Sequence, residues 1–374
     1  MKTQLCDRLG VEFPLFAFSH CRDVVAEVSR AGGFGVFGAA RYSPEELEVE
    51  LRWIDQHVEG RPYGVDVLIP ENMTVHDSGF NAKGLAERVP PQHRAFVRDL
   101  LAKHGVEGGG EPRSAGHVPF MADIAERLLD VAFAHPIRLI ANALGVPPQS
   151  MIDRGRSRNI PVAALVGAAE HAVRQAEAGV DIIVAQGGEA GGHCGEVSTL
   201  VLVPEVVRAV KRYGSPPVLA AGGVMTGRQM AGCMAMGAAG VWTGSVWLAT
   251  PESECSPVLR EKFVAATSRD TVRSKGRTGK YSRQLKSAWT TAWESSDSPG
   301  ALPMPLQSLL AEPSLHLAVR EAERGSERAR ELVTYFVGQG VGLIDSVKTC
   351  RQVVQEFMEE FAEAASEMSA LLEE

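Results

Sequence analysis

Eight short runs of consecutive apolar residues constrain the fold of this 374-residue chain more than any other feature. They occupy residues 13–18, 34–38, 63–69, 137–144, 161–166, 181–186, 217–221 and 240–244. Most are continuously hydrophobic rather than alternating, which is typical of parallel strands that are covered on both faces. Because segments with helical periodicity separate most of the runs, the pattern predicts an α/β fold, a closed (β/α)8 barrel of the TIM type, rather than an open sheet.

The segments between the runs carry recognisable helix signals. Ser43 is followed by a proline and, three positions after the serine, by Glu46, a combination that favours a helix start with a capping box. Gly179 stands where a helical period ends, just before the sixth run. Each such helix would bury its apolar stripe against the barrel wall.

The chain is longer than a barrel needs, since this fold uses about 250 residues. We expect the barrel in residues 1–290 and a helical C-terminal extension, packed on the barrel, in residues 291–374. Residues 70–121 interrupt the rhythm between the third and fourth strands and include a helical piece at 83–103. An insertion after a strand end lies on the face where barrels bind substrates, so we interpret it as a lid or substrate wall; the alternative is a surface excursion.

Composition excludes several classes of protein. The formal net charge of −8 leaves no basic excess for a nucleic-acid partner, and no apolar stretch approaches the length of a membrane span. The six cysteines are scattered without ligand spacing, which predicts no metal site and free thiols in a reducing cytoplasm. We expect a cytoplasmic enzyme that acts on a small molecule, with a homodimer as the expected assembly if it associates at all.

Glycine-rich turns follow the seventh and eighth runs. Ala221 leads into Gly222 and Gly223, and Thr243 leads into Gly244 and Ser245. Barrels that bind phosphate commonly do so with these two loops, because glycine lets backbone N–H groups approach the anion. Since glycines also end strands and make ordinary turns, the two clusters together, rather than either alone, predict a phosphate site.

The loop after the sixth run is the most informative segment. Its sequence, AQGGEAGGHCG, leaves almost no side chains besides Gln186, Glu189, His193 and Cys194. So many glycines are costly to order, and we interpret them as making room for a ligand that lies close to the backbone. His193 would then present an imidazole at the barrel mouth, where it could transfer a proton near neutral pH.

Three sequence strings in these loops resemble those of a known family. AQGGEAGGH, AAGG and GVWTGS, in this order and spacing, resemble the nitronate monooxygenase (2-nitropropane dioxygenase) family, over roughly residues 5–290. The resemblance implies FMN, with its phosphate at the glycines of the last two loops, its ring near Gln186 and Gly187, and His193 facing the substrate. The residues expected around the cofactor are Ala17, Phe18, Asp66, Gln186, Gly187, Gly191, Gly192, Ala221, Gly222, Gly223, Thr243, Gly244 and Ser245.

Two positions depart from the family pattern. Phe18 and His20 stand where the family often has methionine at the end of the first strand, and His20 becomes a second candidate acid or base. Asp66 stands where the family commonly has asparagine. An ionised carboxylate there would repel the negative charge of reduced flavin, so we expect either a lower flavin potential or a raised Asp66 pKa.

A basic run at residues 273–286 is the last candidate. We hypothesise that Arg277, Lys280 and Arg283 grip an anionic part of a substrate, such as the phosphates of an acyl-CoA or a nicotinamide nucleotide. The alternative is a solvated surface segment.

Three functions compete at this point. The first is oxidation of alkyl nitronates by oxygen with FMN, in which His193 orients the anion or removes the α-proton of the neutral nitroalkane. The second is a reductase in which NAD(P)H reduces FMN, which then reduces a quinone or an enoyl thioester; fold and cofactor do not separate the two. The third is a barrel that binds a phosphorylated ligand without catalysis.

Overall fold

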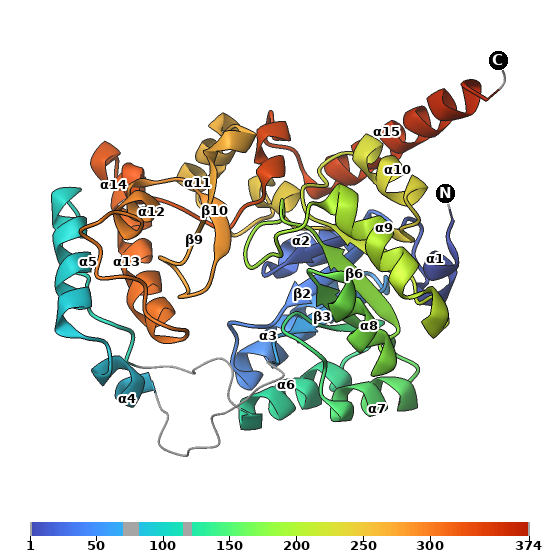
Figure 1. Ribbon diagram of the computed structural model, residues 1–374, viewed down its shortest axis with the longest axis horizontal. Coiled ribbons are helices and arrows are strands. Elements are labelled where there is room, and N and C mark those ends of the chain that lie inside the picture. Colours follow the sequence, from blue (N-terminus) through green and yellow to red (C-terminus); the bar gives the residue numbers. More distant parts are fainter. Residues whose placement is uncertain (1, 70–81, 115–121, 373–374) are drawn as a thin grey trace.

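Eight parallel strands close into a barrel in chain order, as predicted. The computed structural model describes residues 2–69, 82–114 and 122–372 (Figure 1). The strands are β1 (Leu15–Ser19), β2 (Phe34–Gly38), β3 (Tyr63–Val67), β4 (Leu139–Asn142), β5 (Val162–Val166), β6 (Ile182–Gln186), β7 (Val218–Ala221) and β8 (Gly240–Thr243). Seven of the eight apolar runs contain one of these strands, the first run ends one residue before the end of β1, and β8 pairs with β1 to close the ring.

Alternating side chains give the barrel two apolar layers. Inward-facing residues such as Phe16, Phe34 and Trp242 fill the interior, and their neighbours in sequence face the surrounding helices. Leu5 and Leu9 of α1 (Gln4–Leu9) belong to the interior cluster, so this helix covers the end where β1 begins. The opposite end, where the strands finish, is left for ligands.

Helices surround the barrel. They are α2 (Arg22–Arg30), α3 (Pro44–His57), α6 (Ala122–Ala134), α7 (Gln149–Ser157), α8 (Ala169–Glu177), α9 (Thr199–Ala209) and α10 (Gly227–Ala235). The start of α3 has the predicted capping box: the Ser43 hydroxyl accepts from the N–H of Glu46, and the Glu46 carboxylate accepts from the N–H of Ser43.

A second lobe with its own hydrophobic core lies beside the barrel (Figure 1). It contains α4 (Ala82–Glu87), α5 (Pro91–Lys103), α11 (Pro257–Ala265), α12 (Ala288–Trp293), α13 (Leu306–Glu323), α14 (Glu327–Leu332) and the antiparallel pair β9 (Thr271–Ser274) and β10 (Ser282–Leu285). Trp289 and Trp293 pack in its centre with Leu101 and Leu310. The helix α5, inserted between β3 and β4, therefore shares one core with helices that follow β8.

The insertion between the third and fourth strands contributes α4 and α5 to this lobe, and both helices contact α13. The expected helical piece at 83–103 is interrupted by Pro90 and Pro91, because proline cannot continue a preceding helix but suits the first turn of a new one. Residues 70–81 and 115–121 of the predicted lid lie outside the described residues.

The last helix, α15 (Cys350–Ala370), returns to the barrel. Val353, Val354 and Phe357 bury themselves against α10 and α2, and the distal end extends beyond the body of the molecule (Figure 1). The segment after residue 290 is thus divided: α13 and α14 lie in the second lobe, whereas α15 packs on the barrel.

Candidate active site

Several of the predicted site residues meet inside the barrel where the strands finish. Phe18, Asp66 and Gln186 stand on inward-facing positions of β1, β3 and β6, as the alternation of the strands requires. The Phe18 and Trp242 rings stack with their centroids 6.4 Å apart. Ala17 faces the other way, into the core between the barrel and its helices, so only its backbone could serve a ligand.

Asp66 is the most unusual of these groups. It is 5% exposed, and its carboxyl has no hydrogen bond or ion pair with any of the described residues. Burial raises its pKa to about 7, because a charge is poorly solvated there. Below that pH the group is a neutral carboxylic acid that can donate as well as accept a hydrogen bond. Of the two expectations for an aspartate at this position, the raised pKa is the one that the structure supports.

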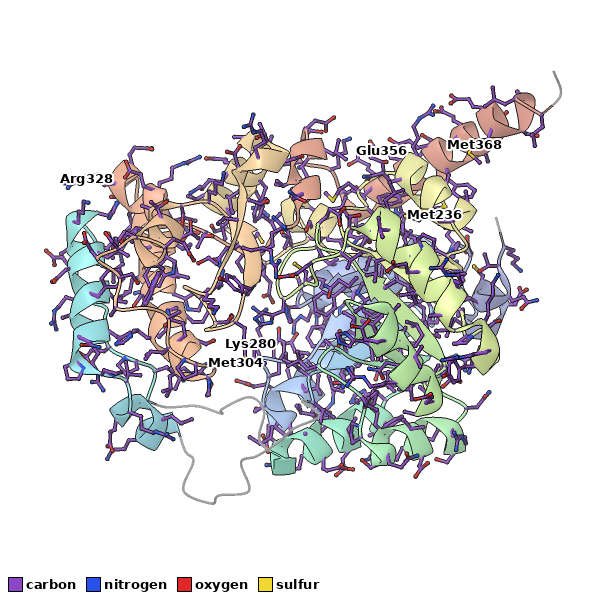
Figure 2. The ribbon with its side chains drawn as sticks, viewed as in Figure 1. Met236, Lys280, Met304, Arg328, Glu356 and Met368 are labelled. Atoms are coloured by element: carbon purple, nitrogen blue, oxygen red, sulfur yellow. The ribbon has the colours of Figure 1, made fainter. Side chains whose placement is uncertain are left out.

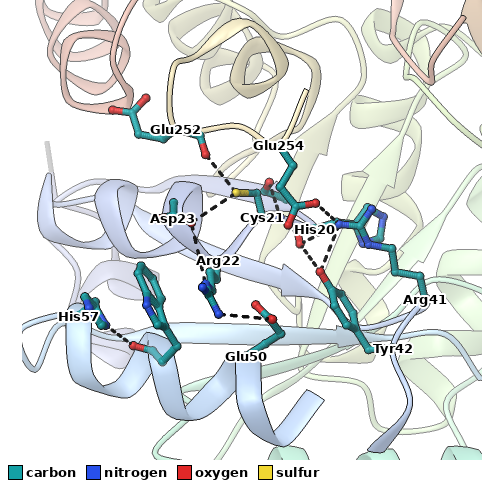
Figure 3. Close-up of polar contacts among 12 residues, drawn as sticks. His20, Cys21, Arg22, Asp23, Arg41, Tyr42, Glu50, His57, Glu252 and Glu254 are labelled. Atoms are coloured by element: carbon teal, nitrogen blue, oxygen red, sulfur yellow. Dashed lines mark hydrogen bonds and ion pairs between the residues drawn. The ribbon is translucent and has the colours of Figure 1, made fainter. Parts of the chain in front are cut away.

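His20 lies at the end of β1 in a network of polar contacts (Figure 3). Its Nδ1 is 2.7 Å from the Gly38 carbonyl oxygen, which can only accept, so Nδ1 carries the proton. Its own carbonyl accepts from the Tyr42 hydroxyl and from Arg41, which is paired with Glu254. Burial and then the charge of Arg41 lower the pKa of His20 to about 4, so the imidazole is neutral at physiological pH.

The glycine-rich loop after β6 is held between the barrel and the second lobe. Gly192 and Arg283 exchange two backbone hydrogen bonds of 2.9 and 2.8 Å, and the Arg283 guanidinium donates to the Gly188 carbonyl. A Cβ on Gly191 would meet the backbone of Val337 and Gly338 at 2.8 Å. Close approach of protein backbone therefore explains glycine at position 191, where a ligand had been expected.

Close approach of other protein atoms also explains glycine at positions 187 and 222. A Cβ on Gly187 would lie 2.2 Å from the Thr199 hydroxyl, and one on Gly222 would lie 2.9 Å from the same atom. Gly192 and Gly244 differ, because a Cβ on either would meet nothing within 4 Å. Of these four glycines, only Gly192 and Gly244 therefore have open space beside them that a ligand could occupy.

His193 projects from this loop toward the second lobe. Its Nε2 is 2.9 Å from the Thr278 hydroxyl, and its ring centroid is 6.4 Å from that of Phe336. Burial, and then the positive charge of Lys280, lower the pKa of His193 to about 4. His193 is therefore a second neutral imidazole at the strand ends.

The loops after β7 and β8 present unused donors. Among the described residues, the N–H groups of Gly223, Gly244 and Ser245 have no acceptor, and the Ser245 hydroxyl accepts from the N–H of Gly338 while its own proton stays available. This arrangement suits an anion. The N-terminus of α10 does not contribute in the same way, because the Glu360 carboxylate accepts from the first N–H of that helix, at Gly227.

Thr243 does not have the place that the sequence suggested. Its side chain faces outward and is 2% exposed; the hydroxyl donates to the Phe16 carbonyl at 2.9 Å and accepts from the Trp247 indole at 3.0 Å. Because the hydroxyl proton is used in the bond to Phe16, the Thr243 side chain links β8 to β1 and has no free donor for a phosphate.

The basic run also differs from its expected role. Arg277 is 4% exposed; its guanidinium donates to Glu312 at 2.7 and 2.9 Å and lies over the Phe336 ring, so it supports the site wall and is closed to substrate. Arg283 is committed to the glycine-rich loop. Lys280 alone of the three is exposed, on the side of the second lobe that faces the barrel (Figure 2).

Thr278, Phe336 and Arg41 were not expected from the sequence. Thr278 and Phe336 lie far along the chain from the strand ends that they approach, Arg41 follows β2 by three residues, and none of the three belongs to a glycine loop or a recognisable motif. In the sequence, the RTGKYSR string that contains Thr278 is distinguished only by its charges.

No group of three or more potential metal ligands occurs among the described residues. Within the same residues, no helix has the length and apolar character to cross a membrane.

Solved structures place the molecule in a class. The chain is 27% identical to FabK from Thermotoga maritima, with 99% of each chain covered and a TM-score of 0.73. A nitroalkane oxidase from Streptomyces ansochromogenes shares the fold at 24% identity, with a TM-score of 0.79 over 98% of this chain and 100% of that one. The chain is a (β/α)8 barrel of the oxidoreductase class, and its candidate site lies at the carboxyl ends of the strands.

The chain belongs to the nitronate monooxygenase family, whose model matches residues 3–360. It is 52% identical to a putative monooxygenase, Rv1533, of Mycobacterium tuberculosis over the full length of both chains. It is also 30% identical over 298 residues to a probable nitronate monooxygenase of Staphylococcus aureus, covering 76% of this chain and 78% of that one.

Proposed function

We propose that this chain is an FMN-dependent oxidoreductase that oxidises alkyl nitronates with molecular oxygen. The observation that carries the proposal is a neutral imidazole, His193, beside the ammonium group of Lys280 at the carboxyl ends of the strands. A neutral imidazole can accept a proton from a carbon acid, and a nearby positive charge favours the anion that results. Membership of the family supports the same chemistry.

The residues present fit FMN. The unused N–H groups of Gly223, Gly244 and Ser245 would hold its phosphate, and Asp66 and Gln186 would supply polar atoms for the ring. A bound FMN would supply the electron acceptor of the reaction. As a neutral acid, Asp66 could donate a hydrogen bond to an acceptor on the ring without adding a charge beside it.

The protein's own part is binding and proton transfer. For a neutral nitroalkane, His193 would remove the α-proton; a nitronate has already lost this proton, and for it His193 would only orient the anion. Phe336, supported from behind by Arg277, would form an apolar wall of the substrate space.

A reductase is the second candidate, and the exposed ammonium of Lys280 favours it. A cation at the barrel mouth suits the phosphate of a nicotinamide nucleotide or an acyl-CoA as well as it suits a nitronate. In that case NAD(P)H would be the electron donor and a quinone or an enoyl thioester the acceptor.

Anaerobic stopped-flow absorbance would test the proposal. The purified protein is mixed separately with NADH, NADPH and a nitronate while the flavin bands are followed. We expect one-electron reduction by the nitronate alone. Rapid bleaching by a nicotinamide would establish the reductase instead, and a preparation without a flavin spectrum would leave a non-catalytic phosphate-binding barrel.

A further inference from the structure

Thr278 lies in the turn between β9 and β10, with its hydroxyl 2.9 Å from Nε2 of His193. The residue is 6% exposed. It therefore contacts the candidate base from the second lobe, on the opposite side from the barrel strands.

The partners of the Thr278 hydroxyl determine which atom donates in each of its hydrogen bonds. The Lys280 carbonyl, 3.0 Å away, can only accept, so the hydroxyl proton of Thr278 points to it. The Lys280 N–H, at 3.3 Å, can only donate. Because a threonine hydroxyl has a single proton, its remaining capacity is that of an acceptor, and the proton in the contact with His193 must come from Nε2.

We propose that Thr278 is a positioning residue that holds His193 as the Nε2–H tautomer and leaves Nδ1 as the basic nitrogen. Nδ1 has no donor or acceptor among the described residues, so its lone pair is not used by the fold. The catalytic consequence rests on the proposed function, whereas the tautomer is a property of the protein itself.

The opposite tautomer would break this arrangement. With the proton on Nδ1, Nε2 would have to accept from Thr278, and the hydroxyl would have to abandon the Lys280 carbonyl. A doubly protonated ring would keep the contact with Thr278 but would leave no lone pair for a substrate proton. The low pKa of His193 keeps its ring neutral at physiological pH. Two neutral tautomers are then possible, and Thr278 selects the one with the proton on Nε2.

The turn that carries Thr278 is fixed from three sides. Gly279 donates its N–H to the Lys275 carbonyl at 2.9 Å, and a Cβ on Gly279 would lie 2.2 Å from the Leu302 carbonyl oxygen. Arg277, one residue earlier, is anchored by Glu312. The hydroxyl therefore stands on a rigid support, as a positioning residue requires.

Nuclear magnetic resonance can read the tautomer directly. The holoprotein is labelled with 15N-histidine, and long-range 1H–15N spectra distinguish a protonated ring nitrogen from an unprotonated one. The His193 signals are assigned by their absence from the His193→Gln variant. We expect a single tautomer in the wild type, with the proton on Nε2; a proton on Nδ1 would overturn the proposal.

Two substitutions distinguish the effect of the Thr278 hydroxyl from the effect of side-chain packing. Thr278→Val keeps the shape and removes the hydrogen bonds, and Thr278→Ser keeps the hydroxyl. For Thr278→Val we expect mixed tautomers and a kcat on a neutral nitroalkane that is lower by roughly tenfold or more, with KM within about twofold. Thr278→Ser should restore both the spectrum and kcat.

A Thr278→Val protein with the wild-type spectrum and the wild-type kcat would overturn the positioning role. The proposed function fails in a different way: the nitronate would then not reduce the flavin in the anaerobic experiment, while the tautomer of His193 in the wild type would still be measurable. The two ideas can therefore be rejected separately.

Discussion

At the scale of single residues, the site depends on groups whose burial changes their protonation. Asp66, His20 and His193 all carry pKa values moved toward the neutral form, and in each case burial is the largest cause. The sequence identified all three positions and gave a raised Asp66 pKa as one of two expectations. It did not predict the neutral imidazoles, because the residues that bury them come from distant segments.

Asp66 makes a prediction about stability and pH. Its folded-state pKa of about 7 lies above the ordinary value of 3.8, so the stability that its neutral form contributes is full in acid and is lost as the pH rises through 7. Relative to Asp66→Asn, the wild type should lose about 2 to 3 kcal/mol of unfolding free energy between pH 5 and pH 8. Urea unfolding of both proteins at the two pH values measures this, and parallel pH dependences would contradict it.

His193 makes a prediction about substrates. Replacement by Asn should lower kcat/KM for a neutral nitroalkane by about 10²- to 10⁴-fold, and by much less for a preformed nitronate, which needs no base. Because the pKa of His193 is about 4, protonation of this residue should not slow the wild-type reaction on the nitroalkane between pH 8 and pH 5 and should slow it only nearer pH 4. Equal losses on both substrates would show that His193 orients the anion and is not a base.

At the scale of elements, the strands were predictable and the second lobe was not. Each strand is a continuous apolar run because both of its faces are covered, and that pattern is visible in a short window of sequence. The pairing of α5 with α13 joins segments about 200 residues apart. Arg277 shows the same difficulty: in sequence it belongs to a basic run, and only its contact with Glu312, 35 residues further on, reveals a buried ion pair.

The glycine-rich loop makes a prediction at this scale. Gly191→Ala should lower both thermal stability and turnover, because a Cβ there meets the backbone of Gly338 at 2.8 Å and backbone cannot move aside cheaply. Gly232→Ala is the matched control: this exposed glycine inside α10 has open space around it, and alanine should stabilise the helix by about 0.5–1 kcal/mol. Thermal melts and steady-state kinetics of the two variants decide the matter, and a Gly191→Ala protein as active as the control would show that the packing is not needed.

At the scale of the whole molecule, the two cores are joined through the site. The glycine-rich loop contacts β10 and the segment around Gly338, and α15 closes the barrel wall at α10. The barrel sequence alone therefore does not contain everything that holds His193.

The C-terminal helix makes a prediction at this largest scale. Phe357→Ala should destabilise the protein by about 3–5 kcal/mol, because the ring is 1% exposed in the core between α15 and the barrel. Deleting residues 366–374, which follow the last buried position at Ala364, should change stability by less than about 1 kcal/mol. Chemical unfolding measures the free energy of unfolding of both variants. A truncation that lowers it as much as Phe357→Ala would mean that the distal part of α15 contributes substantially to stability.

The two backbone bonds between Gly192 and Arg283 have a consequence for biosynthesis. The eight strands are complete by residue 243, so a nascent chain could close its barrel while the remaining third is still being made. Its histidine loop, however, gains its contacts with Thr278, Arg283 and the segment around Gly338 only after those residues emerge from the ribosome and dock. Assembly of the site is therefore a late event in the life of each new molecule, separate from formation of the barrel.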